Sequence, residues 1–263
     1  MSGRDITQET RRLFAIDLFG LAELELRTQE PAMYQWVRDR VKGERDQNAR
    51  AALRDRWWIF GEARSTFRPV LQASSRVITT SLTAKHRIFT FVPAQTICDS
   101  ATVMLALPDA LHLGVLSSSV HSRWALASNS TLEDRPRYIK TVCFENFSFP
   151  AEDTGLSPAL YDQIATLAEQ IDAHRKRQQA THPSLTLTGM YNVLELLRQA
   201  QDDRVLSARE RTIHAQGLVS VLKELHDELD TAAMQSYGLA ADPGKDALLT
   251  YLVALNAQRA QEE

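Results

Sequence analysis

The spacing of the apolar residues changes near residue 152, and this change constrains the fold more than any other feature of the chain. Before it, short β-type runs alternate with helical spacing. After it, apolar residues recur every three or four positions, which is the period of an amphipathic helix. A chain of 263 residues is long enough for one large or two small domains. We therefore expect an α+β domain over residues 1–152 and an all-α helical domain over residues 153–263.

Runs of β-branched and aromatic residues predict the strands of the first domain. Helical spacing predicts helices over 21–42, with Pro31 near a helix start and Gly43 after the end, and over 111–127. The predicted strands cover residues 11–19, 57–61, 76–80, 87–92, 102–107 and 142–149.

The second domain reads as four helices. Ser207 followed by Glu210 forms a capping-box pattern at the start of the third helix, and Gly238 ends it. His214 and His226 lie on this third helix, and we interpret both as surface residues. The four helices are predicted over residues 158–179, 187–200, 207–237 and 243–260.

Charge is distributed unequally between the two domains. The net charge of −3 combines +4 over residues 1–150 with −7 over residues 151–263. A basic part joined to an acidic part suggests that one part meets a polyanion and the other does not.

Several features exclude membrane and secreted proteins. No apolar run approaches the roughly 20 residues of a membrane span, and the N-terminal residues lack the apolar stretch of a signal peptide. Cys98 and Cys143 lie far apart in the sequence, as expected for reduced thiols. We expect a cytoplasmic protein without a membrane partner.

Catalytic motifs are missing from the sequence. There is no Gly-rich nucleotide loop, no G-x-S-x-G and no H-E-x-x-H. The run from His226 to Glu228 lacks the second histidine of a zinc site. The Asn/Asp-Pro-Pro-Tyr/Phe tetrad that grips a flipped base in amino-methyltransferases is absent too. We expect no catalytic residue, no metal and no cofactor site in this chain.

A collinear set of short segments nevertheless resembles a known family over nearly the whole chain. It resembles the C-terminal region of large class I SAM-dependent, adenine-specific DNA methyltransferases of the type IIL/IIG restriction–modification and phage-defence kind. The segments that carry the resemblance are GRD from Gly3, ERDQN from Glu44, RWWIFGE from Arg56, AKHR from Ala84, LGVLSS from Leu113, FSFP from Phe147, DAHRKR from Asp172, TGMYNV from Thr188, GLVSVL from Gly217 and LHDELD from Leu225.

The resemblance implies a target-recognition domain followed by a helical segment, with double-stranded DNA as the partner. In the family, S-adenosylmethionine and the catalytic tetrad belong to a domain on the N-terminal side, so we expect this chain alone to be inactive. The chain departs from the family pattern after its Trp-bearing helix. Relatives carry Gly-Arg-Leu-Gly and then Tyr-Asn-Lys, whereas this chain has Asn-Ser-Thr-Leu at 129–132 and Tyr-Ile-Lys at 138–140. The change predicts either a different target sequence or a loss of function.

DNA recognition needs cations for the phosphates and a few side chains for the base edges. We predict phosphate contacts from Arg4, Lys85, Arg87 and Arg123. We predict base contacts from Asn129, Arg135, Arg137 and Lys140. Tyr138 and Phe144 are expected in the core. An alternative is a helical protein-interaction module, in which the acidic half docks a separate methyltransferase subunit.

Overall fold

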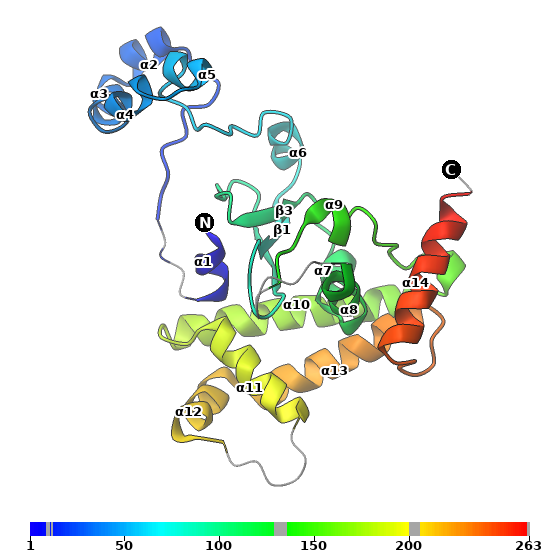
Figure 1. Ribbon diagram of the computed structural model, residues 1–263. Coiled ribbons are helices and arrows are strands. Elements are labelled where there is room, and N and C mark those ends of the chain that lie inside the picture. Colours follow the sequence, from blue (N-terminus) through cyan, green and yellow to red (C-terminus); the bar gives the residue numbers. More distant parts are fainter. Residues whose placement is uncertain (9–10, 12, 129–135, 200–205, 262–263) are drawn as a thin grey trace. The chain divides into compact units, whose positions relative to one another are not determined.

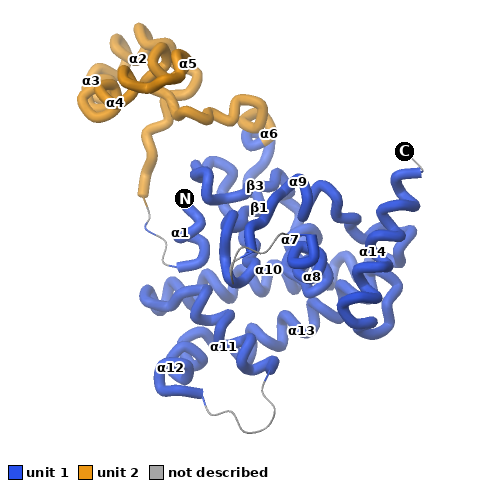
Figure 2. The backbone as a smooth tube through the Cα atoms, in the orientation of Figure 1, with its two compact units in different colours: residues 1–11, 71–263 blue, residues 12–70 orange. Residues whose placement is uncertain are grey.

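The computed structural model describes residues 1–8, 11, 13–128, 136–199 and 206–261. Its contacts divide the chain into unit 1, residues 1–11 and 71–263, and unit 2, residues 12–70, which Figure 2 distinguishes by colour. The α+β class is confirmed, because a small antiparallel sheet is followed by a long helical region (Figure 1). The boundary expected at residue 152 stays a prediction; by contacts alone, residues 71–152 and the later helices belong to one unit.

Unit 2 consists of short helices. Pro31 occupies the first turn of a helix, as predicted, where its missing N–H costs nothing. Gly43 does not end the helical stretch, which continues to Asp46. The helices are α2 (Glu23–Gln29), α3 (Pro31–Val37), the π-helix η1 (Arg38–Lys42), α4 (Gly43–Asp46) and α5 (Ala51–Asp55), and α6 (Arg68–Gln72) crosses into unit 1.

An aromatic pair organises the core of unit 2. The ring of Trp57 meets that of Tyr34 edge to face, with centroids 5.7 Å apart, and both side chains are buried. Leu26 completes the cluster from α2. The strand predicted at 57–61 is therefore wrong: Trp57 and Trp58 pack in this cluster, and the run forms no ladder.

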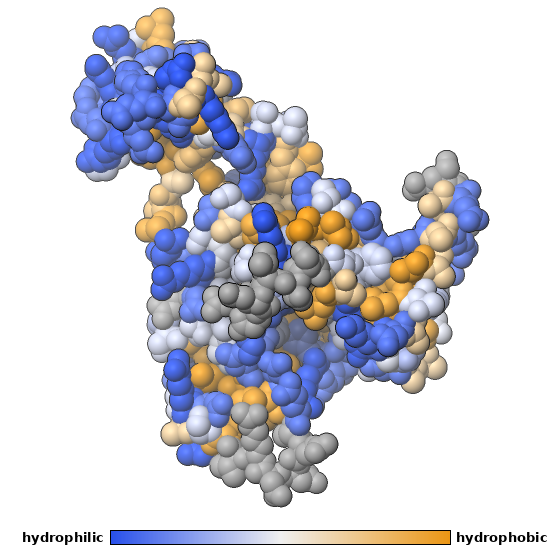
Figure 3. Space-filling view, viewed as in Figure 1, coloured by the Kyte–Doolittle hydropathy of each residue, from blue (hydrophilic) through white to orange (hydrophobic). Residues whose placement is uncertain are grey.

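The strand predicted at 11–19 is also wrong. Residues 13–18 adopt no regular structure, and Leu13 and Phe14 are 74% and 103% exposed. Figure 3 shows apolar surface along this segment. Among residues 13–18, only Leu18 is buried. The apolar run here does not mark a core strand.

The sheet in unit 1 confirms the other three predicted strands of the first 110 residues. It contains β1 (Arg76–Ser81), β2 (Phe89–Pro93) and β3 (Thr102–Leu105) in the order β2-β1-β3, with both pairings antiparallel. Ile78 on the central strand lies opposite Phe91 on one side and Leu105 on the other. Because side chains alternate between the faces of a strand, these three share one face.

That face packs on two helices, α7 (Ala110–Ser117) and α10 (Pro158–Thr181). The helices approach closely at Gly114, where a Cβ atom would lie 2.5 Å from Ile164 Cγ2. Tyr138 is fully buried in the same cluster, as predicted. The first and second halves of the sequence therefore share a core.

The remaining elements of unit 1 are helical. The helix expected over 111–127 is interrupted at Ser118, which is extended. No strand forms over 142–149, where the rings of Phe144 and Phe147 instead each meet that of Phe149 edge to face. The other elements are α1 (Gly3–Thr7), α8 (Ser119–Ser128), α9 (Lys140–Cys143), the 3-10 helix η2 (Glu152–Thr154), α11 (Leu187–Gln199), α12 (Ala208–Gly217), α13 (Val219–Ser236) and α14 (Lys245–Arg259).

The single helix predicted over 207–237 is two helices. Ser207 and Glu210 form the predicted capping box. The chain then turns at Leu218, whose φ of 43° is left-handed. The buried His174 lies 2.8 Å from the carbonyl oxygen of Gly217, so a contact from another helix holds the last carbonyl of α12.

Candidate nucleic-acid interface

A polar cleft of about 450 Å³ lies in unit 1. Its walls come from the loop between β1 and β2 and from the helices α8, α11 and α13. Five cationic side chains and two carboxylates line it. They are Lys85, Arg87, Arg123, Arg175 and Arg198, with Glu195 and Asp230.

The β1–β2 loop brings Lys85 and His86 to the cleft. Lys85 Nζ and His86 Nε2 each lie 2.8 Å from the Oδ1 atom of Asn192 on α11. Lys85 also lies 3.4 Å from a carboxylate oxygen of Glu195, and 44% of its side chain is exposed. The ammonium group of Lys85 is thus held at the surface, where solvent or a ligand reaches it.

Arg87 has a different environment. Its guanidinium donates to the carbonyl oxygens of Ser81 and Pro136 and lies 4.9 Å from the ring centre of Tyr138. Burial lowers the pKa of Arg87 to about 10. The donors of Arg87 hold neighbouring chain segments together. The predicted phosphate contact stays a prediction, and this geometry favours a positioning role instead.

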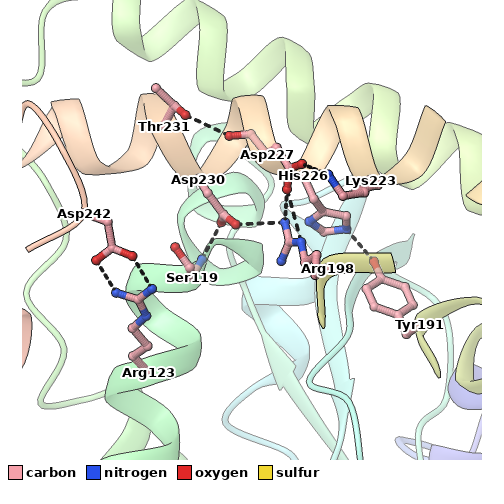
Figure 4. A network of polar contacts seen from close by, with 10 residues as sticks. All are labelled: Ser119, Arg123, Tyr191, Arg198, Lys223, His226, Asp227, Asp230, Thr231 and Asp242. Atoms are coloured by element: carbon pink, nitrogen blue, oxygen red, sulfur yellow. Dashed lines mark hydrogen bonds and ion pairs between the residues drawn. The ribbon is translucent and has the colours of Figure 1, made fainter. Parts of the chain in front are cut away.

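Arg123 projects from α8 and forms a two-pronged ion pair with Asp242 (Figure 4). The two nitrogen–oxygen distances are 2.6 and 2.5 Å. The hydrogen bonds from Arg123 and from the backbone of Gly244 lower the pKa of the Asp242 carboxyl to about 2. The carboxylate is therefore charged throughout the physiological pH range.

Arg198, at the end of α11, binds two carboxylates of α13. Its guanidinium lies 2.7 Å from Asp227 and 3.0 Å from Asp230. Asp230 also accepts the backbone N–H of Ser119, the first residue of α8, at 2.6 Å. This carboxylate satisfies an N-terminal donor of α8 and compensates its dipole. Burial raises the pKa of Asp230.

His226 is buried, so its predicted surface position is wrong. Its Nε2 atom lies 2.7 Å from the hydroxyl of Tyr191, which accepts a hydrogen bond from Arg175 at 3.0 Å. Burial and the nearby charges of Arg175 and Arg198 lower the pKa of His226 to about 3. The imidazole is therefore neutral at pH 7. Its hydrogen bond with Tyr191 stabilises it in the interior, and helical spacing alone does not reveal that partner.

The described part of the predicted base-reading segment, which starts at Pro136, lies beside the cleft. Pro136 lines the cleft, Arg137 forms an isolated bridge with Thr83, and the backbone N–H of Tyr138 donates to Leu82 at 2.7 Å. The side chain of Arg137 is exposed. The β1–β2 loop therefore anchors this segment and leaves Arg137 facing solvent.

The other predicted residues lie apart from this group. Arg4 is exposed on α1. Lys140 begins α9 and pairs with Glu145 at 3.0 Å. Asn129 and Arg135 lie outside the described residues. Among the predicted phosphate contacts, the structure thus brings Lys85, Arg87 and Arg123 into one cleft.

Sequence reasoning missed Arg198 and Asp242. Both belong to the helical half, whose net negative charge gave no reason to expect residues of the candidate site there. No helix among the described residues is long and apolar enough to cross a membrane. In the same part of the chain, no group of three His, Cys, Asp or Glu side chains is arranged to hold a metal ion.

The chain is similar to a restriction–modification enzyme. Residues 24–151 match the family model of the MmeI target recognition domain. The type IIL restriction–modification enzyme MmeI, solved in complex with DNA, shares the fold with a TM-score of 0.62 and 18% sequence identity. That similarity covers 94% of this chain but 29% of the MmeI chain, so this protein spans less than a third of the relative's length. No curated protein matches the sequence. The resemblance predicted from the sequence is therefore confirmed: residues 24–151 match the target recognition domain of MmeI, and the chain has the fold of a type IIL restriction–modification enzyme over the matched region.

Proposed function

We propose that this chain is the sequence-specific duplex-DNA recognition module of a bacterial restriction–modification enzyme. The observation that carries the proposal is the match of residues 24–151 to a target recognition domain. The relative with the same fold was solved with DNA bound. A cleft with an excess of cationic side chains, next to the exposed Arg137, supplies the chemistry that DNA recognition needs.

The residues divide into two roles. Lys85 and Arg123 neutralise phosphates from the cleft, and Arg4 does so from α1. The segment after α8 reads base edges through Asn129, Arg135, Arg137 and Lys140. The hydrogen bond between Tyr138 and the β1–β2 loop supports this division, because a side chain that reads nucleobases must be held on a rigid part of the protein.

The complete system would methylate adenine with S-adenosylmethionine supplied by a separate domain or subunit. This part of the proposal rests on the family resemblance alone. The chain itself would contribute target choice and no catalytic group. A role in phage defence and a cytoplasmic location stay predictions.

The test is the binding of a labelled random-sequence duplex to the full chain, followed by fluorescence anisotropy over a range of salt concentrations. We expect binding that weakens steeply with salt, with a slope of about −0.9 in log K against log salt for each phosphate contacted. Absence of binding at low salt would contradict the proposal.

The alternative is a helical protein-interaction module whose acidic half docks a methyltransferase subunit. Exposed apolar side chains outside that half favour a docking surface in unit 2 instead: Leu13, Phe14, Leu24 and Trp36 are each more than half exposed. Substituting Leu13 and Phe14 by serine separates the two functions. Loss of a partner with unchanged DNA affinity supports docking, whereas loss of DNA affinity does not.

A further inference from the structure

Asp242 binds Arg123 in the way that a phosphate group would. Both terminal nitrogens of Arg123 donate to the two oxygens of the same carboxylate. The planar fork of a guanidinium fits carboxylate and phosphate oxygens equally well. Arg123 lines the cleft, and 28% of its side chain is exposed. In the unbound protein, therefore, an acidic side chain of the chain itself takes the donors that DNA would need.

Asp242 is placed so that it can leave Arg123. It lies in the connection between α13 and α14, and every residue from 240 to 247 is exposed. Besides its contacts with Arg123, it accepts the backbone N–H of Gly244 at 2.8 Å. Moving this side chain away from Arg123 thus removes no buried apolar contact.

The carboxylate beside it differs. Asp230 is held by Arg198 and by the backbone of Ser119, and most of its surface is covered by protein. Displacing it would leave the first N–H of α8 without its partner. Of these two carboxylates, Asp242 is therefore the one that an incoming phosphate can displace.

We propose that Asp242 is an internal substitute for a DNA phosphate on Arg123, and that the DNA backbone displaces it on binding. This inference rests on the proposed function. It predicts that Asp242 weakens the binding of every duplex alike, because the ion pair must open and the released carboxylate stays near the phosphates. It leaves the salt slope nearly unchanged, because Arg123 contacts one phosphate in the complex whether or not Asp242 was bound to it before.

The experiment compares Asp242→Asn with the wild-type chain on one labelled duplex of random sequence. Removing the competing charge should tighten binding by up to about fivefold at moderate salt, the upper end of the range for an exposed ion pair. The slope of log K against log salt should stay close to that of the wild type, since both proteins contact the same phosphates. Equal affinity would overturn the inference while leaving DNA binding itself intact.

A matched control exists in the same chain. Asp153 forms a two-pronged ion pair with Arg259, and its side chain is 43% exposed, against 50% for Asp242. Neither Asp153 nor Arg259 lines the cleft. Asp153→Asn changes the net charge by the same amount, so it should leave the affinity and the slope close to wild type. An equal gain in this control would show a general charge effect and would overturn the inference.

A double substitution tests whether Asp242 acts through Arg123. In an Arg123→Gln background, Asp242→Asn should give little or no gain in DNA affinity, because no guanidinium is left to release. The full gain in that background would contradict the mechanism. If neither wild type nor Asp242→Asn binds duplex at low salt, while thermal unfolding shows both folded, the proposed function fails and this inference fails with it.

Discussion

Arg175 donates a hydrogen bond of 2.7 Å to the carbonyl oxygen of Phe89, so a fully buried guanidinium of α10 satisfies the edge strand β2. The next outward-facing carbonyl of that strand, Phe91, accepts from Lys176 at 2.7 Å. Asp172 compensates both cations and also accepts from Thr90. With these two carbonyls occupied, this stretch of the edge is less able to pair with another chain. The same contacts fasten the helical region to the sheet beneath the cleft.

Arg175→Met should therefore destabilise the protein by about 3 kcal/mol, because Asp172 stays buried after losing one of its two cationic partners. Urea unfolding at neutral pH measures the effect. Arg177→Met is the control, since Arg177 is exposed on the same helix and should cost no more than about 0.5 kcal/mol. Equal stability of the two variants would show that the buried network contributes little.

Acid should destabilise the protein through its buried histidines. His226 has a pKa of about 3 in the folded chain and about 6.5 when unfolded, so between these values the unfolded state binds the extra proton. Stability is then present above about pH 6.5 and declines as the pH falls, by about 1.4 kcal/mol per unit. His121 is shifted in the same direction by burial.

The variant His226→Gln removes one of these sites and keeps a polar partner for Tyr191. Between pH 7.5 and 5.5 it should lose roughly 1.4 kcal/mol less unfolding free energy than the wild type, as measured by urea unfolding at each pH. An identical loss in both proteins would mean that His226 is not kept neutral by the fold.

The long amphipathic helices could be predicted from the sequence, and the aromatic runs could not. Ile164, Leu167 and Ile171 recur at helical spacing on α10, and all three are buried. The runs at 57–61 and 142–149 contain residues typical of strands, yet their rings pack against one another and against helices. The residue types there indicate that the side chains will be buried, but tertiary structure decides whether they pack in a sheet or against helices. The turn between α12 and α13 could not be predicted either, because its left-handed residue is Leu218 and not the glycine that this conformation favours.

The candidate site was predictable only in part, for a related reason. Lys85 and Arg123 are predicted from the sequence as phosphate contacts, and the structure places both in one cleft. The partners of these cations, Glu195 and Asp242, lie more than 100 residues further along the chain. No local pattern links residues so distant in sequence. Only the folded structure shows that carboxylates of the acidic half pair with the cations of the cleft.

The chain alone should not bind S-adenosylmethionine, because it lacks a Gly-rich loop and the Asn/Asp-Pro-Pro-Tyr/Phe tetrad. Isothermal titration calorimetry of the full chain should give no heat of binding. Micromolar affinity would show that the chain holds a cofactor site of a kind that the known motifs do not describe.

Arg137 and Lys85 should differ in what they contribute to DNA binding. Arg137→Ala should relax the preference at one base position by about 1–3 kcal/mol, because a truncated base reader no longer distinguishes base pairs. Lys85→Ala should weaken binding to all duplexes alike and reduce the salt slope by about one. Competition between the preferred duplex and its single-base variants measures both. An unchanged preference in Arg137→Ala would place the reading loop elsewhere.

The central claim is that this chain recognises a duplex sequence. The most direct measurement is a selection from randomised DNA duplexes with the wild-type chain, followed by sequencing of the bound fraction. The account predicts enrichment of one short motif, which Arg137→Ala loses at one position and Lys85→Ala retains. A bound fraction as random as the starting pool would contradict sequence recognition, and it would indicate that the altered segment at 129–132 no longer reads bases.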